Sequence, residues 1–283
     1  MDLSFTKMEG LGNDFIMVDD RKQGIAKIEA YNDIAKKLCD RRFGIGADGL
    51  IIVLDSTTCD IQFRIFNSDG SEAQMCGNGM RCLARYVYES GMNEKSELTV
   101  ETLAGVIIPK LNMDDNGKIR SVTVDMGQPI LDAEKIPFKP SLPGALVQTI
   151  ATDNGPVSFT AVSMGNPHAI IFVDDTATAP LLETGPLVET HPSFPQKTNV
   201  EFIQVLSDSE LRMKVWERGA GVTLACGTGA CAAVVAAILN GKTKNTVIVH
   251  LDGGDLEITW DKESGHVFKT GPARTVFQGR IQI

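Results

Sequence analysis

The sequence predicts an α+β protein built from two similar halves, and three observations lead to this prediction. Short β-branched segments come in runs rather than in strict alternation with helices, which favours antiparallel or mixed sheets. A Cys-Gly-polar-Gly segment occurs at Cys76 and again 150 residues later at Cys226. Each copy opens an apolar helical pattern that ends at a glycine, Gly91 or Gly241, the residue type preferred just after a helix. We therefore expect each half to be a mixed sheet around one central helix, with pseudo-symmetry between the halves.

Composition limits the kind of protein this is. The chain has 283 residues, 43% of them hydrophobic, which is enough for two domains with cores of their own. The net charge of −9 argues against nucleic acid as a partner. Residues 1–10 show no basic region leading into an apolar block, and the most apolar run, 225–239, is interrupted by Gly, Thr and Cys. We expect a cytoplasmic protein that has no membrane partner.

The repeat extends beyond the cysteines. Residues 76–91 read CGNGMRCLARYVYESG and residues 226–241 read CGTGACAAVVAAILNG. The runs that precede them, DIQFRIF and ELRMKVW, alternate with the period of a strand. Further upstream, GNDFIMVDD resembles GNPHAIIFVDD in the same order. The whole fold is therefore predicted to be duplicated.

The remaining elements follow from local patterns. Residues 49–54 and 198–205 read as short strands, and 31–40 as a minor helix. The turn signal DDNGK places a boundary between 114 and 129, and a last strand, 275–283, is expected to return to the first domain. The predicted domains are 1–124 plus 273–283, which contains Cys76, and 125–272, which contains Cys226.

Each repeated cysteine precedes a Gly-rich start of a helix, and this position has chemical consequences. Unpaired backbone N–H groups and the helix dipole favour negative charge there, which lowers a thiol pKa. The same N–H groups can seat a carboxylate, because glycine lets a ligand come close to the backbone. If the two halves face each other across a cleft, a small carboxylate between them has a thiol on either side. This arrangement indicates a racemase or epimerase that uses two bases.

Six cysteines in a chain of this size are too few and too irregularly spaced for a disulfide scaffold, so we expect reduced thiols. Cysteines 39, 59, 82 and 231 are predicted to be core residues. A zinc site made from Cys76/Cys82 and Cys226/Cys231 has the wrong spacing for the usual ligand pairs, so no metal site is predicted.

Five segments together resemble the diaminopimelate epimerase family, in matching order over the full chain: GLGNDF, FNSDGSEAQMCGNGMRC, MGNPH, TNVEF and WERGAGVTLACGTGACA. The resemblance implies two pseudo-symmetric halves with the active site in the cleft between them. It also implies that two cysteines invert the α-carbon of LL-2,6-diaminopimelate to give the meso isomer, for lysine and peptidoglycan synthesis. Neither a metal nor pyridoxal phosphate is expected as a cofactor. A homodimer is the expected assembly.

The resemblance also implies roles for individual residues. Cys76 and Cys226 become the acid and the base, and His168 and Glu217 lie where the family has residues near the thiols. Backbone amides for the reacting carboxylate come from Gly77, Asn78, Gly227 and Thr228. The substrate's other polar groups are assigned to Asn13, Asn67, Asn166, Asn199, Glu217 and Arg218. Arg218 suits a bidentate grip on a carboxylate.

Two positions depart from family members. Gly49 stands where some of them place a Gln that touches the ligand, so no side-chain contact is expected from it. Val222 replaces a residue that is often Glu, outside the amide cradle. Simple structural roles also remain open, since Asn13 and Asn166 follow glycines and can be turn residues, and Glu217-Arg218 can be a solvated strand end.

Two other functions stay open at this point. The nearer one is a proline-racemase-like enzyme with paired cysteines, against which the WERGAG segment and the set of asparagines argue. The other is a thiol redox or metal-binding protein in which Cys76 and Cys226 form a switchable disulfide. Assays with proline and with a chelator separate these alternatives.

Overall fold

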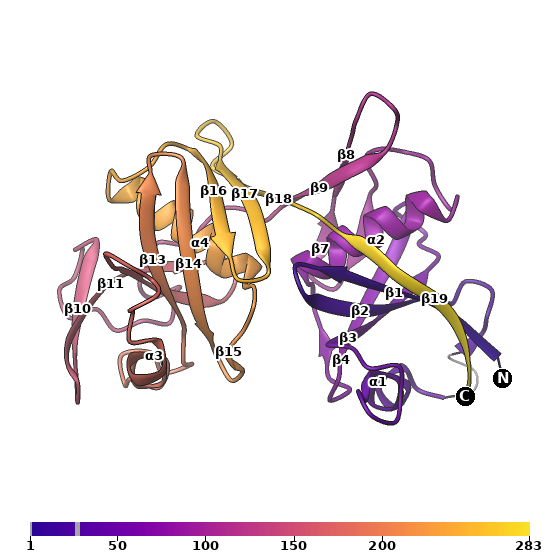
Figure 1. Ribbon diagram of the computed structural model, residues 1–283, viewed down its shortest axis with the longest axis horizontal. Coiled ribbons are helices and arrows are strands. Elements are labelled where there is room, and N and C mark those ends of the chain that lie inside the picture. Colours follow the sequence, from indigo (N-terminus) through magenta and orange to yellow (C-terminus); the bar gives the residue numbers. More distant parts are fainter. Residues whose placement is uncertain (1, 26–28) are drawn as a thin grey trace. The chain divides into compact units, whose positions relative to one another are not determined.

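The computed structural model describes residues 2–25 and 29–283. Contacts divide the chain into two compact units, and each is described by itself. Unit 1 is Met1–Asp125 together with Thr270–Ile283, and unit 2 is Met126–Lys269. Figure 1 shows the elements of each unit in the colours of the sequence. None of the helices in the described residues is long and apolar enough to cross a membrane.

Unit 1 is a mixed sheet with two helices. Its helices are α1 (Tyr31–Cys39) and α2 (Gly77–Glu89). Its strands are β1 (Asp2–Gly10), β2 (Asn13–Asp19), β3 (Gly49–Leu54), β4 (Ile61–Asn67), β5 (Glu72–Ala73), β6 (Val100–Thr102), β7 (Gly105–Ile107), β8 (Lys110–Met113), β9 (Ile119–Asp125) and β19 (Arg274–Gln282). The sheet order is β19-β1-β2-β3-β4-β6-β7, with β5 beside β4, so the last strand of the chain pairs antiparallel with the first. Strands β8 and β9 pair with each other outside this sheet.

Unit 2 repeats this plan. Its helices are α3 (Leu181–Glu189) and α4 (Gly227–Leu239). Its strands are β10 (Val147–Thr152), β11 (Gly155–Ser163), β12 (Pro167–Phe172), β13 (Asn199–Ser207), β14 (Glu210–Glu217), β15 (Gly221–Val222), β16 (Thr246–Leu251), β17 (Gly254–Trp260) and β18 (Val267–Gly271). They run in the order β10-β11-β12-β13-β14-β16-β17-β18.

Strand directions show how closely the units correspond. From β19 to β7, neighbouring strands of unit 1 pair antiparallel, antiparallel, parallel, antiparallel, parallel and antiparallel. From β10 to β17, unit 2 follows the same series. Strand β19 therefore takes the place in unit 1 that β10 takes in unit 2. The predicted α+β fold with pseudo-symmetric halves is confirmed.

The helices correspond residue by residue. Both α1 and α3, and both α2 and α4, begin and end 150 residues apart. Helix α3 is not among the sequence predictions, because Gly185-Pro186 in its interior is a helix-breaking pair. A Cβ added to Gly185 would lie 2.7 Å from Cγ of Trp216, so glycine lets this helix lie directly against the indole.

In unit 1 the sheet lies between the two helices. Leu50 and Ile52 on β3 face the core that contains α1, and Ile51 between them faces the other way. A Cβ added to Gly79 at the start of α2 would lie 2.9 Å from Cδ1 of Ile51, which places α2 against that opposite face. In unit 2, α4 is buried without interruption from Gly229 to Ala237, as expected of a central helix that is apolar on all sides.

Of the four cysteines that were predicted to be core residues, three are buried. Cys39, Cys82 and Cys231 are buried, and burial raises the pKa of both Cys39 and Cys82 to about 12. The prediction is wrong for Cys59, which lies in a bend before β4 and is partly exposed. Its place in a short loop with Ser, Thr and Asp neighbours explains the difference, because loops run over the surface.

Candidate active site

Each central helix begins at a cysteine that serves as its N-cap. Cys76 and Cys226 both have extended backbone angles, and the first residues of α2 and α4 follow them directly. The Sγ of Cys76 accepts the backbone N–H of Gly79 at 3.4 Å, and the Sγ of Cys226 accepts that of Gly229 at the same distance. Both sulfurs therefore sit where unpaired N–H groups favour a negative charge.

In unit 1, Asn78 connects the start of α2 with the first residue of β2. Its Nδ2 donates to Oδ1 of Asn13 at 3.2 Å, and its Oδ1 accepts from Arg81 at 2.8 Å. Arg81 is fully buried and also donates to the carbonyl of Pro272 at 3.0 Å. Three of the predicted site residues, Cys76, Asn78 and Asn13, are thus held together by hydrogen bonds and chain continuity.

A charged network lies behind Asn13. Its Nδ2 donates to Oδ2 of Asp48 at 2.7 Å, and Arg41 bridges Asp48 and Asp14. Lys7 pairs with Asp14 at 2.6 Å. Burial opposes ionisation of Asp14, but hydrogen bonds from Arg41 and Lys7 outweigh it and lower its pKa to about 2. The network therefore fixes the orientation of the Asn13 amide through Asp48, which Arg41 ties to Asp14.

Asn67 lies at the exposed end of β4, where its Nδ2 donates to the hydroxyl of Ser71 at 2.9 Å. Its partner across the sheet is Gly49. A Cβ added to Gly49 would lie 3.0 Å from the carbonyl oxygen of Phe66, so a residue larger than glycine would crowd the neighbouring strand. The absence of a side chain at position 49 thus has a packing reason as well.

In unit 2, a compact polar cluster surrounds Cys226. His168 on β12 and Glu201 on β13 are both fully buried, and Nδ1 of His168 lies 2.7 Å from Oε1 of Glu201. Nε2 of His168 lies 3.1 Å from Oδ1 of Asn166, whose Nδ2 donates to Thr228 Oγ1 at 3.3 Å. That hydroxyl lies 3.6 Å from Sγ of Cys226. The imidazole, the Glu201 carboxylate and the thiol approach within 4.8 Å of one another.

The lowered thiol pKa expected at a helix start is wrong for Cys226. Burial, followed by the charges of Glu217 and Glu201, raises its pKa well above the usual value, and hydrogen bonds from Thr228 and Gly229 oppose the rise. Burial also raises the pKa of Glu217, whose carboxylate accepts a hydrogen bond from Thr223. A protonated thiol beside a buried carboxylate is an arrangement suited to proton transfer.

Asn199 contacts the backbone of Arg218, and its side-chain amide is engaged by backbone groups of the protein. Asn199 is buried, its Nδ2 donates to the carbonyl of Pro167 at 2.9 Å, and its Oδ1 accepts the backbone N–H of Arg218 at 3.0 Å. The Arg218 side chain is exposed, with one contact of 3.1 Å to the carbonyl of Gln196. Asn199 therefore holds the backbone on which Arg218 is displayed.

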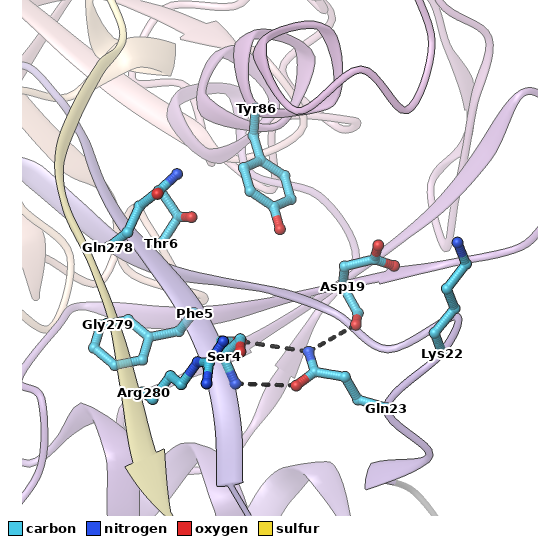
Figure 2. A pocket seen from close by; sticks show the side chains of 10 residues that line it. All are labelled: Ser4, Phe5, Thr6, Asp19, Lys22, Gln23, Tyr86, Gln278, Gly279 and Arg280. Carbon is cyan, nitrogen blue, oxygen red and sulfur yellow. Dashed lines mark hydrogen bonds between the residues drawn. The ribbon is translucent and has the colours of Figure 1, made fainter.

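An open pocket on unit 1 lies away from Cys76. It has a volume of about 600 Å³ and lies on unit 1, and Figure 2 shows its lining from β1, β19 and the C-terminal end of α2. Tyr86 in its wall is nine residues beyond Gly77, which corresponds to about 14 Å of helix. The pocket therefore does not include the Cys76 thiol.

Sequence reasoning missed several residues that support the site. Glu201 was included in the quoted TNVEF segment but received no role, although a carboxylate within a buried apolar strand is a signal in itself, because such a charge must be paired. Arg81, Asp48 and Thr223 likewise hold predicted residues in place, and only the folded arrangement reveals these contacts.

Comparison with known proteins connects this geometry to a family. The family model described as "Diaminopimelate epimerase" matches residues 5–131 and 160–276, which include both capping cysteines. The chain belongs to the diaminopimelate epimerase family. Diaminopimelate epimerase of Desulforapulum autotrophicum is 59% identical over 283 residues, covering all of both chains. That of Pelotomaculum thermopropionicum is 54% identical over 277 residues, 98% of each chain.

Solved structures with this fold extend beyond the epimerase family. A phenazine biosynthesis protein of the PhzF family from Bacillus anthracis superposes with a TM-score of 0.69 at 18% identity, covering all of both chains. A probable proline racemase from Agrobacterium radiobacter gives a TM-score of 0.68 at 17% identity, over 99% of this chain and 93% of the other. At these identities the likeness shows the fold alone. The family assignment rests on the full-length relatives, which make this chain an amino-acid epimerase.

Proposed function

We propose that this epimerase inverts the α-carbon of LL-diaminopimelate between the thiols of Cys76 and Cys226, giving the meso isomer. The observation that carries the proposal is the matched capping position of the two cysteines, each with a backbone N–H at 3.4 Å from Sγ. Two equivalent acid–base groups in a duplicated fold suit a substrate centre that is approached from opposite faces.

The reaction needs one thiolate and one thiol. The thiolate takes the α-proton, so the C–H bond breaks and an S–H bond forms. The opposite thiol then gives its proton to the other face of the carbanion, which restores a C–H bond of inverted configuration. Because burial raises the pKa of Cys226, we assign the proton of the free enzyme to Cys226. The roles are exchanged after one turnover.

Stabilisation of the carbanion falls to the helix starts. The backbone N–H groups of Gly77-Asn78 and Gly227-Thr228 are proposed to hold the reacting carboxylate, on which negative charge grows as the proton leaves. Preorganised N–H groups in a site without water are effective at such a task. The proposed site contains no metal or organic cofactor.

The remaining residues orient the substrate and the thiols. Glu217 is proposed to meet the ammonium group and, with His168, to influence which thiol is ionised. The other polar groups of the substrate are assigned to Asn13, Asn67, Asn166, Asn199 and Arg218. Because Asn199 is engaged by two backbone groups, its proposed contribution is to hold the Arg218 backbone.

Three further parts of the proposal concern organisation. The domain bounds predicted from the sequence, 1–124 plus 273–283 with Cys76 and 125–272 with Cys226, stay part of the proposal, in which both thiols reach the same substrate carbon. A homodimer and a cytoplasmic location remain predictions from the sequence.

A coupled assay of the purified protein with LL-diaminopimelate and no added cofactor tests the proposal. Formation of meso-diaminopimelate at an undiminished rate in the presence of a metal chelator is the expected result. Proline serves as the matched alternative substrate. Turnover of proline in preference to diaminopimelate, or loss of activity with the chelator, contradicts the proposal.

A further inference from the structure

Five side chains form a continuous series of polar contacts from Glu201, near the start of β13, to Cys226 at the start of α4. It runs from Glu201 through His168, Asn166 and Thr228 to Cys226, with successive polar atoms 2.7, 3.1, 3.3 and 3.6 Å apart. The first and last side chains of the series also lie close together, on either side of Gly229. A Cβ added to Gly229 would lie 2.5 Å from Oε1 of Glu201 and 3.2 Å from Sγ of Cys226. The five side chains therefore form a ring of contacts that includes the Cys226 thiol.

The partners of the two imidazole nitrogens determine the direction of each hydrogen bond. Nδ1 of His168 faces a carboxylate oxygen, which only accepts. Nε2 faces the amide oxygen of Asn166, which also only accepts, because the Nδ2 of that residue donates to Thr228. With Glu201 ionised, this pattern has a proton on each ring nitrogen, which makes His168 an imidazolium. Since the Thr228 oxygen already accepts from Asn166, its own proton is free to point to Cys226.

Charge balance supports the same assignment. Glu201 is fully buried, and among the residues that the structure describes its Oε2 has no hydrogen-bond partner. A cation beside it would stabilise a carboxylate in this position, and His168 is the side chain in contact. The other ionisable groups that face this pair are Glu217 on β14 and Cys226 at the start of α4. Both become anionic when ionised, so neither supplies the positive charge.

We infer that Glu201 is a positioning residue that holds His168 as an imidazolium and thereby directs the Thr228 hydroxyl proton toward Cys226. This inference rests on the proposed reaction, in which Cys226 must become a thiolate on alternate turnovers. A hydroxyl already directed at Sγ stabilises that thiolate without any rearrangement in the transition state.

Glu201→Gln removes the charge and keeps the shape. A glutamine can either donate or accept, so the neutral imidazole has two tautomers, and only one of them leaves a proton on Nε2 for Asn166. In the other tautomer the Asn166 amide turns over and accepts the Thr228 proton, which is then lost to Cys226. We expect kcat to fall about 10- to 100-fold, as for loss of a charge-assisted hydrogen bond.

Nitrogen NMR of the histidine rings measures the protonation of each ring nitrogen, and this readout does not depend on enzyme activity. The chain has four histidines, and a His168→Gln spectrum identifies the relevant ring. At pH 8, where an ordinary imidazole is neutral, His168 should show two protonated nitrogens in the wild type and in Glu201→Asp, and one in Glu201→Gln. The matched control is Asp255→Asn, which changes the carboxylate 2.8 Å from Nδ1 of His250. It should leave the His168 signals and kcat unchanged.

The outcomes separate this inference from the proposed function. A wild-type protein that fails to epimerise diaminopimelate contradicts the proposed function, whereas the His168 spectrum still tests the charge. An active wild type whose His168 ring is neutral, or a folded Glu201→Gln protein with kcat within twofold of wild type, overturns the inference. Thermal melting of each variant shows whether the fold is retained.

Discussion

Gly229 donates its backbone N–H to the Sγ of Cys226 while its α-carbon lies against the carboxylate of Glu201. In unit 1 the equivalent Gly79 donates to Cys76, but its α-carbon lies against the flexible end of Ile51. The two halves thus share the same capping hydrogen bond, but a side chain larger than glycine would meet a buried carboxylate in unit 2 and a flexible methyl group in unit 1.

This difference leads to unequal effects of the same substitution. In Gly229→Ala the new methyl group would lie 2.5 Å from a buried carboxylate oxygen, so we expect a loss of stability of about 2–4 kcal/mol and of most activity. In Gly79→Ala the methyl group meets Cδ1 of Ile51 at 2.9 Å, and a rotamer change relieves the contact. We expect a loss of about 1 kcal/mol there. Urea unfolding of both variants measures the contrast, and equal losses would contradict it.

Replacement of either capping cysteine should stop the reaction. In Cys76→Ala or Cys226→Ala, one face of the substrate lacks its acid or base in both directions, so we expect kcat to fall about 100- to 10,000-fold. Cys82→Ala and Cys231→Ala, inside the helices, should mainly lower stability, by about 1 kcal/mol. Cys59→Ala, at a partly exposed position, is the control for both effects. Near wild-type turnover by Cys76→Ala would show that the two-thiol assignment is wrong.

Deuterium incorporation distinguishes two bases from one. In D₂O the thiol opposite the captured proton has already exchanged with solvent, so early meso product formed from LL-diaminopimelate should carry deuterium at the inverted carbon. The remaining LL pool should stay largely protiated, because the captured proton is held on the other cysteine. Mass spectrometry of both pools at low conversion makes the measurement. Protium at the inverted carbon of early product would indicate a single base that returns its own proton.

Acid stability should depend on the charged network behind Asn13. The pKa of Asp14 falls from its ordinary 3.8 to about 2 on folding. This carboxylate therefore stabilises the fold above about pH 4, and the contribution is lost as the pH falls toward 2. In Asp14→Asn, the free energy of unfolding should be lower at neutral pH and should change less between pH 4 and 2. Asp115→Asn, at an exposed turn position, provides the comparison. Parallel pH profiles of wild type and Asp14→Asn would contradict this account.

Local signals in the sequence predict the parts of the site that depend on neighbouring residues. A cysteine followed by Gly-X-Gly and an apolar helical run is sufficient to place Cys76 and Cys226 at helix starts. The glycines after α2 and α4, Gly91 and Gly241, have the positive φ expected of residues that follow a helix. The prediction of the duplicated fold has the same origin, since both copies keep the same order of local patterns.

The parts that escape prediction depend on strand pairing. His168 pairs with Asn199 in the parallel β12–β13 register, and Glu201 lies two residues further along, on the same face of the sheet. No local pattern indicates that these two strands are neighbours, so the partner of His168 is not readable from the sequence. Asn199 illustrates the reverse case, because its family position indicates the substrate, whereas its amide is engaged by the backbone of Pro167 and Arg218.

The position of β19 in the unit 1 sheet has a consequence for synthesis on the ribosome. Unit 2 is a continuous stretch of chain, Met126–Lys269, so nearly all of its strand residues are available once that stretch has emerged. Unit 1 must wait for Arg274–Gln282, because β1 has β19 as its outer neighbour. We therefore expect the half that is translated first to finish folding last, with β1 an open sheet edge in nascent chains until the final strand arrives.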